Sequence, residues 1–436
     1  MKLKLQNSRL GKIGLLALIA LVFSGCGSKP AVKPVNLVVW SVFEDGAQFQ
    51  PLLAHYQKTH PSATVSFVVK PVETYEEDLI NALASGQGPD IFTVNNAWLP
   101  KYLDKVVPAP EALWNYTDYK NAFVDVVVND FVRDRKIYGI ANYVDSLALY
   151  YNKDLLGSAG IATPPKTWDE LQRDTQKLTR QSQLGYFNRS GVALGLSSTA
   201  PGGQIHRAED LLYLFALQKG GQSWSPDGST PLFGQPSQNG LSQQPALDAI
   251  NFFTSFSNPV SRNYTWNTKS DYSIDAFANG RAAMIIDYSY ARQLIQQKAS
   301  NLNFDVASVP QPDLDNPEVN FANYWGYVVS KQTESADGAW EFLKTISEKT
   351  ALDQYYAAHK LPSSRKDLIE LQTQDPDIGV FAHANLTAKN FYRPDQRKVD
   401  ALISKMLDDV TLRGIAPGTA LGQALGQAGA ITIPRP

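Results

Sequence analysis

Aromatic and polar side chains stand together at the ends of two apolar segments of the sequence. They are Trp40, Phe43 and Glu44 after the first segment, and Asn95, Asn96 and Trp98 after the second. A carboxylate or an amide makes several directed hydrogen bonds, and an aromatic ring presents a flat apolar face. Groups of these two kinds, placed close together, suit the non-covalent binding of a small ligand that has polar edges and apolar faces.

The elements around these side chains predict an α/β domain. Residues 36–40, 63–70 and 91–94 are apolar or alternating segments typical of strands, and residues 49–58 and 74–85 carry apolar side chains at helical spacing. Strands that alternate with helices pair in parallel, and ligands gather at the carboxyl ends of such strands. Both groups of side chains are therefore expected at the same edge of one sheet.

The middle of the chain predicts a second, mainly helical region. Thr167, followed three residues later by Glu170, forms a capping box that begins a helix over 168–181. Further helices are expected at 208–217, 246–256, 273–279 and 337–346, and extended segments at 137–141, 146–152, 282–287, 304–309 and 327–330. The loop 198–206 is a candidate for the wall of a site, because its glycines let backbone amides approach a ligand.

The first 25 residues have the composition of a secretory signal peptide. Residues 1–12 are basic, residues 13–23 are apolar, and small residues precede Cys26. A helix of this apolar length reaches only about half of the ~30 Å hydrocarbon layer, which argues against a permanent membrane span. We therefore expect an exported protein of about 410 residues, a length that indicates two domains.

The residues before Cys26 resemble a bacterial lipobox, in which the cysteine becomes the lipid-modified first residue of the mature chain. Phe23 departs from that pattern, because leucine is usual at this place. The resemblance implies lipidation of Cys26, a tether at 26–35, and anchoring at the extracytoplasmic face of the cell membrane. The alternative is an ordinary cleavage site beside an unmodified thiol.

The composition argues against several classes of partner. Cys26 is the only cysteine, so the mature chain holds no internal disulfide and must rely on a large core. Removal of the basic signal peptide leaves a formal charge of about −6, which argues against a nucleic-acid partner. The five histidines lack the spacing of metal ligands, and we expect neither a metal nor another cofactor.

Six segments occur in an order that resembles a known family. They are VVWSVFE, GQGPDIFTVNNAW, YVDSLALYYNKDLL, PPKTWDEL, SIDAFANGRAAMIIDYSY and NYWGYVVSK, which fall within residues 36–350. The chain is similar to the extracellular solute-binding proteins of sugar ABC transporters, the relatives of maltose-binding protein. The resemblance implies a periplasmic-binding-protein-like α/β fold with two interleaved lobes, a hinge and a ligand cleft between them. It also implies a monomer that binds a mono- or oligosaccharide by hinge closure and delivers it to membrane permease subunits.

The resemblance also divides the chain between the lobes. The N-terminal lobe is expected at 36–142 and 310–346, and the C-terminal lobe at 145–305 and 350–436. The segments that cross between the lobes are expected near residues 141–145, 306–310 and 345–350.

A sugar presents hydroxyl groups around a ring with partly apolar faces, so its site needs aromatic surfaces and converging hydrogen-bonding groups. By resemblance, Asp145 corresponds to a family carboxylate that binds sugar hydroxyls, and Tyr290 to a stacking aromatic residue. Tyr288, Tyr324 and Trp325 are expected near the same cleft. The structural alternatives are a salt bridge for Asp145 and packing against the hinge for Tyr324 and Trp325.

Asn95 and Asn96 depart from the pattern of maltose-binding protein, which has an acidic and a basic residue in this loop. The departure predicts a ligand other than maltose. The alternative role for these asparagines is a turn before the next helix, and the alternative for Trp40 is core packing.

Three other functions are weaker alternatives. A peptide or polyamine binder on the same fold would need more acidic residues in its cleft. A ferric-ion binder could use Tyr150 and Tyr151, but adjacent residues of an extended segment point to opposite faces. A polysaccharide-degrading lipoprotein would need paired catalytic carboxylates, and a serine hydrolase would need a G-x-S-x-G turn that the sequence lacks. We therefore expect a binding protein and not an enzyme.

Overall fold

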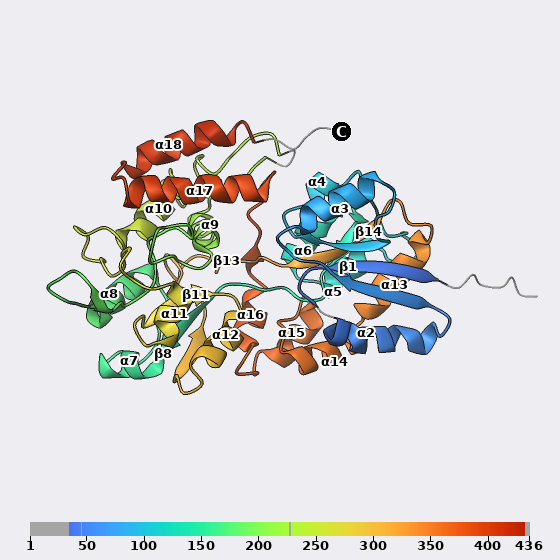
Figure 1. Ribbon diagram of the computed structural model, residues 1–436, viewed down its shortest axis with the longest axis horizontal. Coiled ribbons are helices and arrows are strands. Elements are labelled where there is room, and N and C mark those ends of the chain that lie inside the picture. The colour runs from blue at the N-terminus through green and yellow to red at the C-terminus, as the bar shows by residue number, and fades with distance from the viewer. Residues whose placement is uncertain (1–34, 45, 226–227, 432–436) are drawn as a thin grey trace, which may run out of the picture.

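The computed structural model describes residues 35–44, 46–225 and 228–431 (Figure 1). The predicted signal peptide 1–25, the predicted lipidation site Cys26 and residues 26–34 of the predicted tether lie outside the described residues. Among the helices of the described part, none combines the length and the apolar character that a membrane span requires.

The first lobe is built on a six-stranded sheet. Its strands are, in order, β2 (Thr64–Val69), β1 (Asn36–Ser41), β3 (Ile91–Asn95), β14 (Trp325–Ser330) and β4 (Val106–Val107), with β7 (Gly139–Ile140) also beside β14. β1 pairs in parallel with both β2 and β3, which confirms the predicted strand–helix alternation. β14 runs antiparallel to β3 and places Trp325 opposite Asn95. The sheet is therefore completed by a strand from late in the sequence.

Helices and a small hairpin cover this sheet. They are α2 (Gly46–Thr59), α3 (Tyr75–Ala84), α4 (Leu99–Tyr102), α5 (Tyr116–Ala122), α6 (Asp125–Phe131), the hairpin β5 (Val132–Arg133) and β6 (Lys136–Ile137), α13 (Ala336–Ile346), α14 (Lys349–His359) and α15 (Lys366–Gln372). The buried face of α2 shows why this segment is helical, because Phe49, Leu52, Leu53 and Tyr56 recur at helical spacing. These side chains pack in one core with Val39 of β1.

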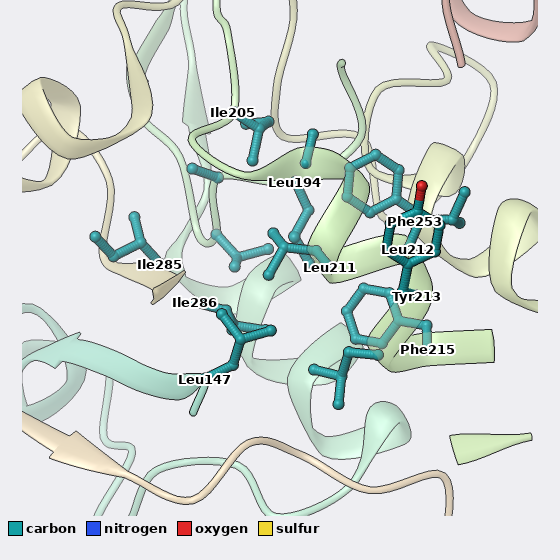
Figure 2. Packing of buried hydrophobic residues seen from close by; sticks show 14 of the residues in the cluster. Leu147, Leu194, Ile205, Leu211, Leu212, Tyr213, Phe215, Phe253, Ile285 and Ile286 are labelled. Carbon is teal, nitrogen blue, oxygen red and sulfur yellow. The ribbon is translucent and has the colours of Figure 1, made fainter. Parts of the chain in front are cut away.

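The second lobe has a separate core around a three-stranded antiparallel sheet. The strands are, in order, β11 (Met284–Asp287), β8 (Ala148–Asn152) and β12 (Phe304–Ala307). The helices are α7 (Lys153–Ser158), α8 (Trp168–Leu178), α9 (Ala208–Gln218), α10 (Pro245–Ser255), α11 (Ser273–Ala278), α12 (Ala291–Lys298), α17 (Gln396–Thr411) and α18 (Pro417–Ala428). Figure 2 shows part of this core, and Leu211 and Phe215 of α9 and Ile286 of β11 are among the buried residues labelled there.

The predicted helix after Thr167 is present but shorter. The Thr167 hydroxyl accepts a hydrogen bond from the Glu170 amide at 3.2 Å, as a capping box requires. The Glu170 carboxylate reaches the amide of Lys166 at 2.7 Å, one residue earlier than the standard pattern. The helix ends at Leu178 because the next residues form the hairpin β9 (Arg180–Gln181) with β10 (Phe187–Arg189).

Three segments connect the two lobes. Along this part of the chain, Val144 is the last residue in the first core and Leu147 is the first in the second, so the first crossing lies at 145–146, at the end of the expected segment 141–145. The chain returns between Phe321 of the second core and Ala322 of the first. This second crossing lies beyond the expected residues 306–310, because the Pro310 carbonyl still accepts a hydrogen bond from Gln218 of α9 at 3.0 Å.

The third crossing also lies further along the chain than the expected residues 345–350. α14 and α15 pack in the first core, where Tyr355 and Tyr356 are fully buried, whereas the prediction assigned residues 350–436 to the second lobe. The chain crosses through α16 (Gly379–Ala384) and β15 (Ala388–Lys389). β15 pairs in parallel with β13 (Asn320–Phe321) of the second crossing. The two late crossings are therefore joined side by side, between the lobes in Figure 1.

Candidate functional site

A cavity of about 780 Å³ lies between the two cores. Its walls include Phe43, Glu44, Trp325 and Tyr355 of the first lobe, Tyr143, Asp145 and Asn323 of the crossings, and His206, Arg207, Tyr288, Ser289, Tyr290 and Arg292 of the second lobe. Seven of the predicted site residues line it: Phe43, Glu44, Asp145, Tyr288, Tyr290, Tyr324 and Trp325. The volume is within the usual range for sites that enclose a small organic ligand.

Glu44 is a carboxylate of the first lobe at this cavity. It follows β1, and its two oxygens accept hydrogen bonds from the hydroxyls of Tyr327 and Tyr355. Burial raises the pKa of Glu44 to about 7, although the bond from Tyr355 opposes the shift. Each oxygen keeps a second lone pair, so the group can still accept a hydrogen bond from a ligand.

Asp145 is the matching carboxylate beside the first crossing. Its oxygens accept hydrogen bonds from the Ser289 amide and the Ser289 hydroxyl, each at 2.9 Å. Burial raises its pKa to about 7, and the charge of Asp287 acts in the same direction. The salt bridge considered for Asp145 is not formed among the described residues. Its contacts instead join the crossing to the loop after β11.

Aromatic faces come to the cavity from both lobes. Phe43 and Trp325 of the first lobe meet edge to face, with ring centroids 5.7 Å apart. Tyr290 of the second lobe is 41% exposed and stacks on Tyr288 at 5.8 Å. Phe43 is 52% exposed, which is unusual for a phenylalanine beside a core. A ring bound in the cavity would therefore find an apolar surface on each lobe.

Tyr288 and Tyr324 support the cavity walls and direct their hydroxyls into the protein. Tyr288 donates to Asp210 at 2.8 Å and Tyr324 donates to Asp130 at 2.7 Å. Both rings are 1% exposed. They hold neighbouring residues in place, and ligand contact by either hydroxyl stays a prediction.

Four predicted site residues are not part of the cavity wall. The amide nitrogen of Asn95 donates to Asn323 at 2.8 Å, and that of Asn96 donates to Asp130 at 3.0 Å. Trp98 donates to Gln396 at 2.9 Å, and the ammonium of Lys70 lies 3.8 Å from the centre of a Trp40 ring. The structure thus places Asn95 and Asn96 among hinge contacts, and direct ligand contact by these four residues stays a prediction.

Several wall residues were not predicted. Tyr355 was not considered because the range 350–436, which contains it, was assigned to the other lobe, and Ser289 is a single polar residue between two candidate tyrosines. Arg207 follows directly after the loop 198–206, of which only His206 is part of the described wall. The described residues contain no group of three or more histidine, cysteine or acidic side chains placed to hold a metal ion.

The chain was compared with known proteins. A family model described as bacterial extracellular solute-binding protein matches residues 40–351. The galactooligosaccharide-binding protein of Bacillus subtilis (strain 168) is 23% identical, over 95% of this chain and 94% of that protein.

Two solved structures share the fold over nearly their whole length. The cyclic alpha-maltosyl-1,6-maltose binding protein from Arthrobacter globiformis has a TM-score of 0.75 at 18% identity and covers 92% of this chain and 99% of its own. A sugar-binding protein from Xanthomonas citri has a TM-score of 0.74 at 19% identity and covers 91% of this chain and 97% of its own. These similarities establish the two-lobe α/β fold.

Proposed function

Since this chain belongs to the bacterial extracellular solute-binding protein family, we propose that it captures a mono- or oligosaccharide in the cavity between its lobes. The observation that carries the proposal is the pairing of aromatic faces with carboxylates on both sides of one cavity. Tyr290 and Asp145 contribute these groups on one side, and Phe43, Trp325 and Glu44 on the other. Rings contact the apolar faces of a sugar, and carboxylates accept from its hydroxyls.

The names of relatives support a sugar as the ligand. The similar protein of Bacillus subtilis is a galactooligosaccharide-binding protein, and the similar structure from Arthrobacter globiformis binds a cyclic maltosyl-maltose. A related structure from Thermotoga lettingae is described as an ABC transporter solute-binding protein bound with alpha-D-tagatose. We propose the same class of ligand here, and delivery of the sugar to the membrane permease subunits of an ABC importer.

The binding step is non-covalent. A sugar first meets the groups of one lobe, and closure of the lobes then adds the groups of the other. A ligand shifts this equilibrium only by its greater affinity for the closed form. The paired strands β13 and β15 and the first crossing are the segments around which such closure would take place.

We also propose that the protein acts as a monomer attached to the membrane through a lipid on Cys26. The proposal rests on the lipobox-like sequence before Cys26 and on the extracellular family to which the chain belongs. Mass spectrometry of the N-terminus of the protein purified from its membrane tests it. An acylated Cys26 is expected, and an unmodified N-terminus at another residue would contradict it.

Calorimetry with a panel of neutral and acidic mono- and oligosaccharides tests the proposed function. At least one sugar is expected to bind, and Tyr290→Ala should weaken that binding by removing an aromatic face. Leu184→Ala, which changes a side chain 76% exposed on the second lobe, is the control and should bind as the parent does. If every sugar fails while a peptide or a polyamine binds, the alternative ligand classes replace this proposal.

A further inference from the structure

Arg207 is a cationic group of the cavity wall that forms no ion pair with a carboxylate of the described residues. Within the described residues, no ion pair involves Arg207, whereas Arg292 pairs with Asp377 at 2.8 Å and Lys360 pairs with Asp375 at 2.6 Å. An arginine in a protein does not lose its proton, so it keeps its full charge at this wall.

The nearby acidic groups have other partners. Asp210 acts on Arg207 through its charge, but it accepts hydrogen bonds from Tyr288 at 2.8 Å and Asn323 at 3.2 Å and lies 3.6 Å from Arg393. Asp287 holds Nδ1 of His206 at 2.7 Å. The neighbourhood of Arg207 therefore contains acidic groups, but each is engaged elsewhere.

The guanidinium of Arg207 is hydrogen-bonded to the hydroxyl at the edge of an aromatic ring. Its Nε donates to the hydroxyl of Tyr290 at 3.3 Å, which leaves the two terminal nitrogens for another partner. The backbone of Arg207 has φ 56° and ψ 35°, a left-handed conformation that is uncommon for a residue with a side chain. Such a conformation persists only where the surrounding structure holds it, and here it sets the start of α9 and the direction of the side chain.

The inference drawn from these observations rests on the proposed function and refines it. From the terminal nitrogens of Arg207, which have no hydrogen-bond partner among the described residues and lie at the hydroxyl end of the exposed ring of Tyr290, we infer that the ligand is an acidic sugar, with a carboxylate such as that of a uronic acid. The sugar ring lies on Tyr290, and the carboxylate accepts two hydrogen bonds from the guanidinium, which is planar and matches a carboxylate in geometry. Closure of the lobes around a neutral sugar would instead desolvate the charge of Arg207 without giving it an ion-pair partner.

The test compares matched pairs of disaccharides by calorimetry. Each pair is a neutral disaccharide and its uronate counterpart with the same linkage, in the gluco, galacto and manno series. At least one uronate should bind about tenfold to a hundredfold more tightly than its neutral counterpart, the range for a charge-assisted bidentate contact. Raising the salt concentration should reduce this preference.

Variants of Arg207 test whether this side chain causes the preference for a uronate over its neutral counterpart. Arg207→Met should remove the preference for the uronate, because the uronate loses its ionic contact while the neutral sugar binds as well as before or more tightly, since its closure no longer desolvates a charge. Arg207→Lys should retain part of it, since the charge remains but the planar fork is lost. Arg173→Met is the matched control, because Arg173 is 67% exposed on α8 and is not part of the cavity wall. Urea unfolding of each variant verifies that the fold is kept.

The outcomes separate this inference from the proposed function. Equal or tighter binding of the neutral members overturns the acidic ligand and leaves the sugar-binding function intact. An acidic preference that survives Arg207→Met, or an equal loss for both members of a pair, also overturns it. Failure of every sugar in both series contradicts the proposed function itself.

Discussion

Single residues determine how the cavity responds to pH. Glu44 and Asp145 have pKa values raised to about 7 by burial, so they are partly protonated in the empty cavity near neutral pH. Both are already bonded to protein donors, and they accept further bonds from sugar hydroxyls most strongly when ionised. Their titration therefore affects ligand affinity and protein stability in opposite directions.

Affinity for a neutral sugar is expected to rise between pH 5.5 and pH 8. Over this interval Glu44 and Asp145 lose their protons and become stronger acceptors. The gain should be about tenfold, measured by calorimetry at the two pH values. The double variant Glu44→Gln with Asp145→Asn should lose most of this dependence, and a steep dependence retained in that variant would refute the assignment.

Stability of the ligand-free protein should fall over the same interval. A carboxyl group whose pKa is higher in the folded state than in the unfolded state stabilises the fold fully below its unfolded pKa, and the contribution disappears as the pH rises through its folded pKa. For Glu44 and Asp145 this places the loss between about pH 4 and pH 7, and the part of it that falls above pH 5.5 is on the order of a few kcal/mol for the pair. Urea unfolding at pH 5.5 and pH 8 measures it, and the same double variant should show a smaller difference.

Among the elements, α6 holds the hinge through one buried carboxylate. Asp130 accepts hydrogen bonds from Asn96 after β3 at 3.0 Å, from Tyr324 before β14 at 2.7 Å and from Asn390 of the third crossing at 3.0 Å. Three segments far apart in sequence therefore share one acceptor. Burial raises the pKa of Asp130 to about 6, although all three hydrogen bonds oppose the shift.

Asp130→Ala should destabilise the protein by about 3–5 kcal/mol, because it leaves several buried donors without an acceptor. Asp130→Asn should cost less, since one acceptor oxygen remains. The control is Asp125→Asn on the same helix, where the side chain is 69% exposed in an ion pair with Lys366; its expected cost is below about 1 kcal/mol. Urea unfolding measures the stability of all three variants. Equal losses of stability for Asp130→Ala and Asp125→Asn would exclude the role given to Asp130.

The sequence predicted those elements whose formation depends on residues close together in the chain. The alternation at 63–70, the helical spacing at 74–85 and the cap at Thr167 each depend on residues a few positions apart, and the elements form close to the predicted places. The helix expected over 273–279 is present as α11, and Gly280 just after it has a φ of +69°. Local steric and hydrogen-bonding preferences are sufficient for such features.

The hinge could not be predicted in the same way. Asn95 and Asn96 were considered for a ligand role or a turn, whereas the partners of their amide nitrogens in the structure, Asn323 and Asp130, are remote in sequence. The places of the later crossings depend on whether Tyr355 and Pro310 contact one core or the other. Such long-range contacts have no local pattern that would reveal them.

At the scale of the whole molecule, the proposed function requires the two lobes to approach each other when the ligand binds. Small-angle scattering should show a smaller radius of gyration with saturating sugar than without it. The variant Tyr290→Ala with Asp145→Asn, examined at the same sugar concentration, should remain as extended as the free protein. An unchanged radius in the parent protein, under conditions where calorimetry shows saturation, would exclude closure as the mode of capture.

The position of β14 has a consequence for the newly made chain. β14 lies between β3 and β4 in the first sheet, yet it is synthesised more than two hundred residues after β3. At about 5–20 residues per second, β14 is synthesised roughly 10–50 s after β3. Until then the edges of β3 and β4 lack their central partner, and the first lobe cannot complete its fold. The first lobe therefore stays incompletely folded for much of the synthesis of the chain. For an exported protein, this gives the secretion machinery time to engage the chain before it becomes too compact to be threaded across a membrane.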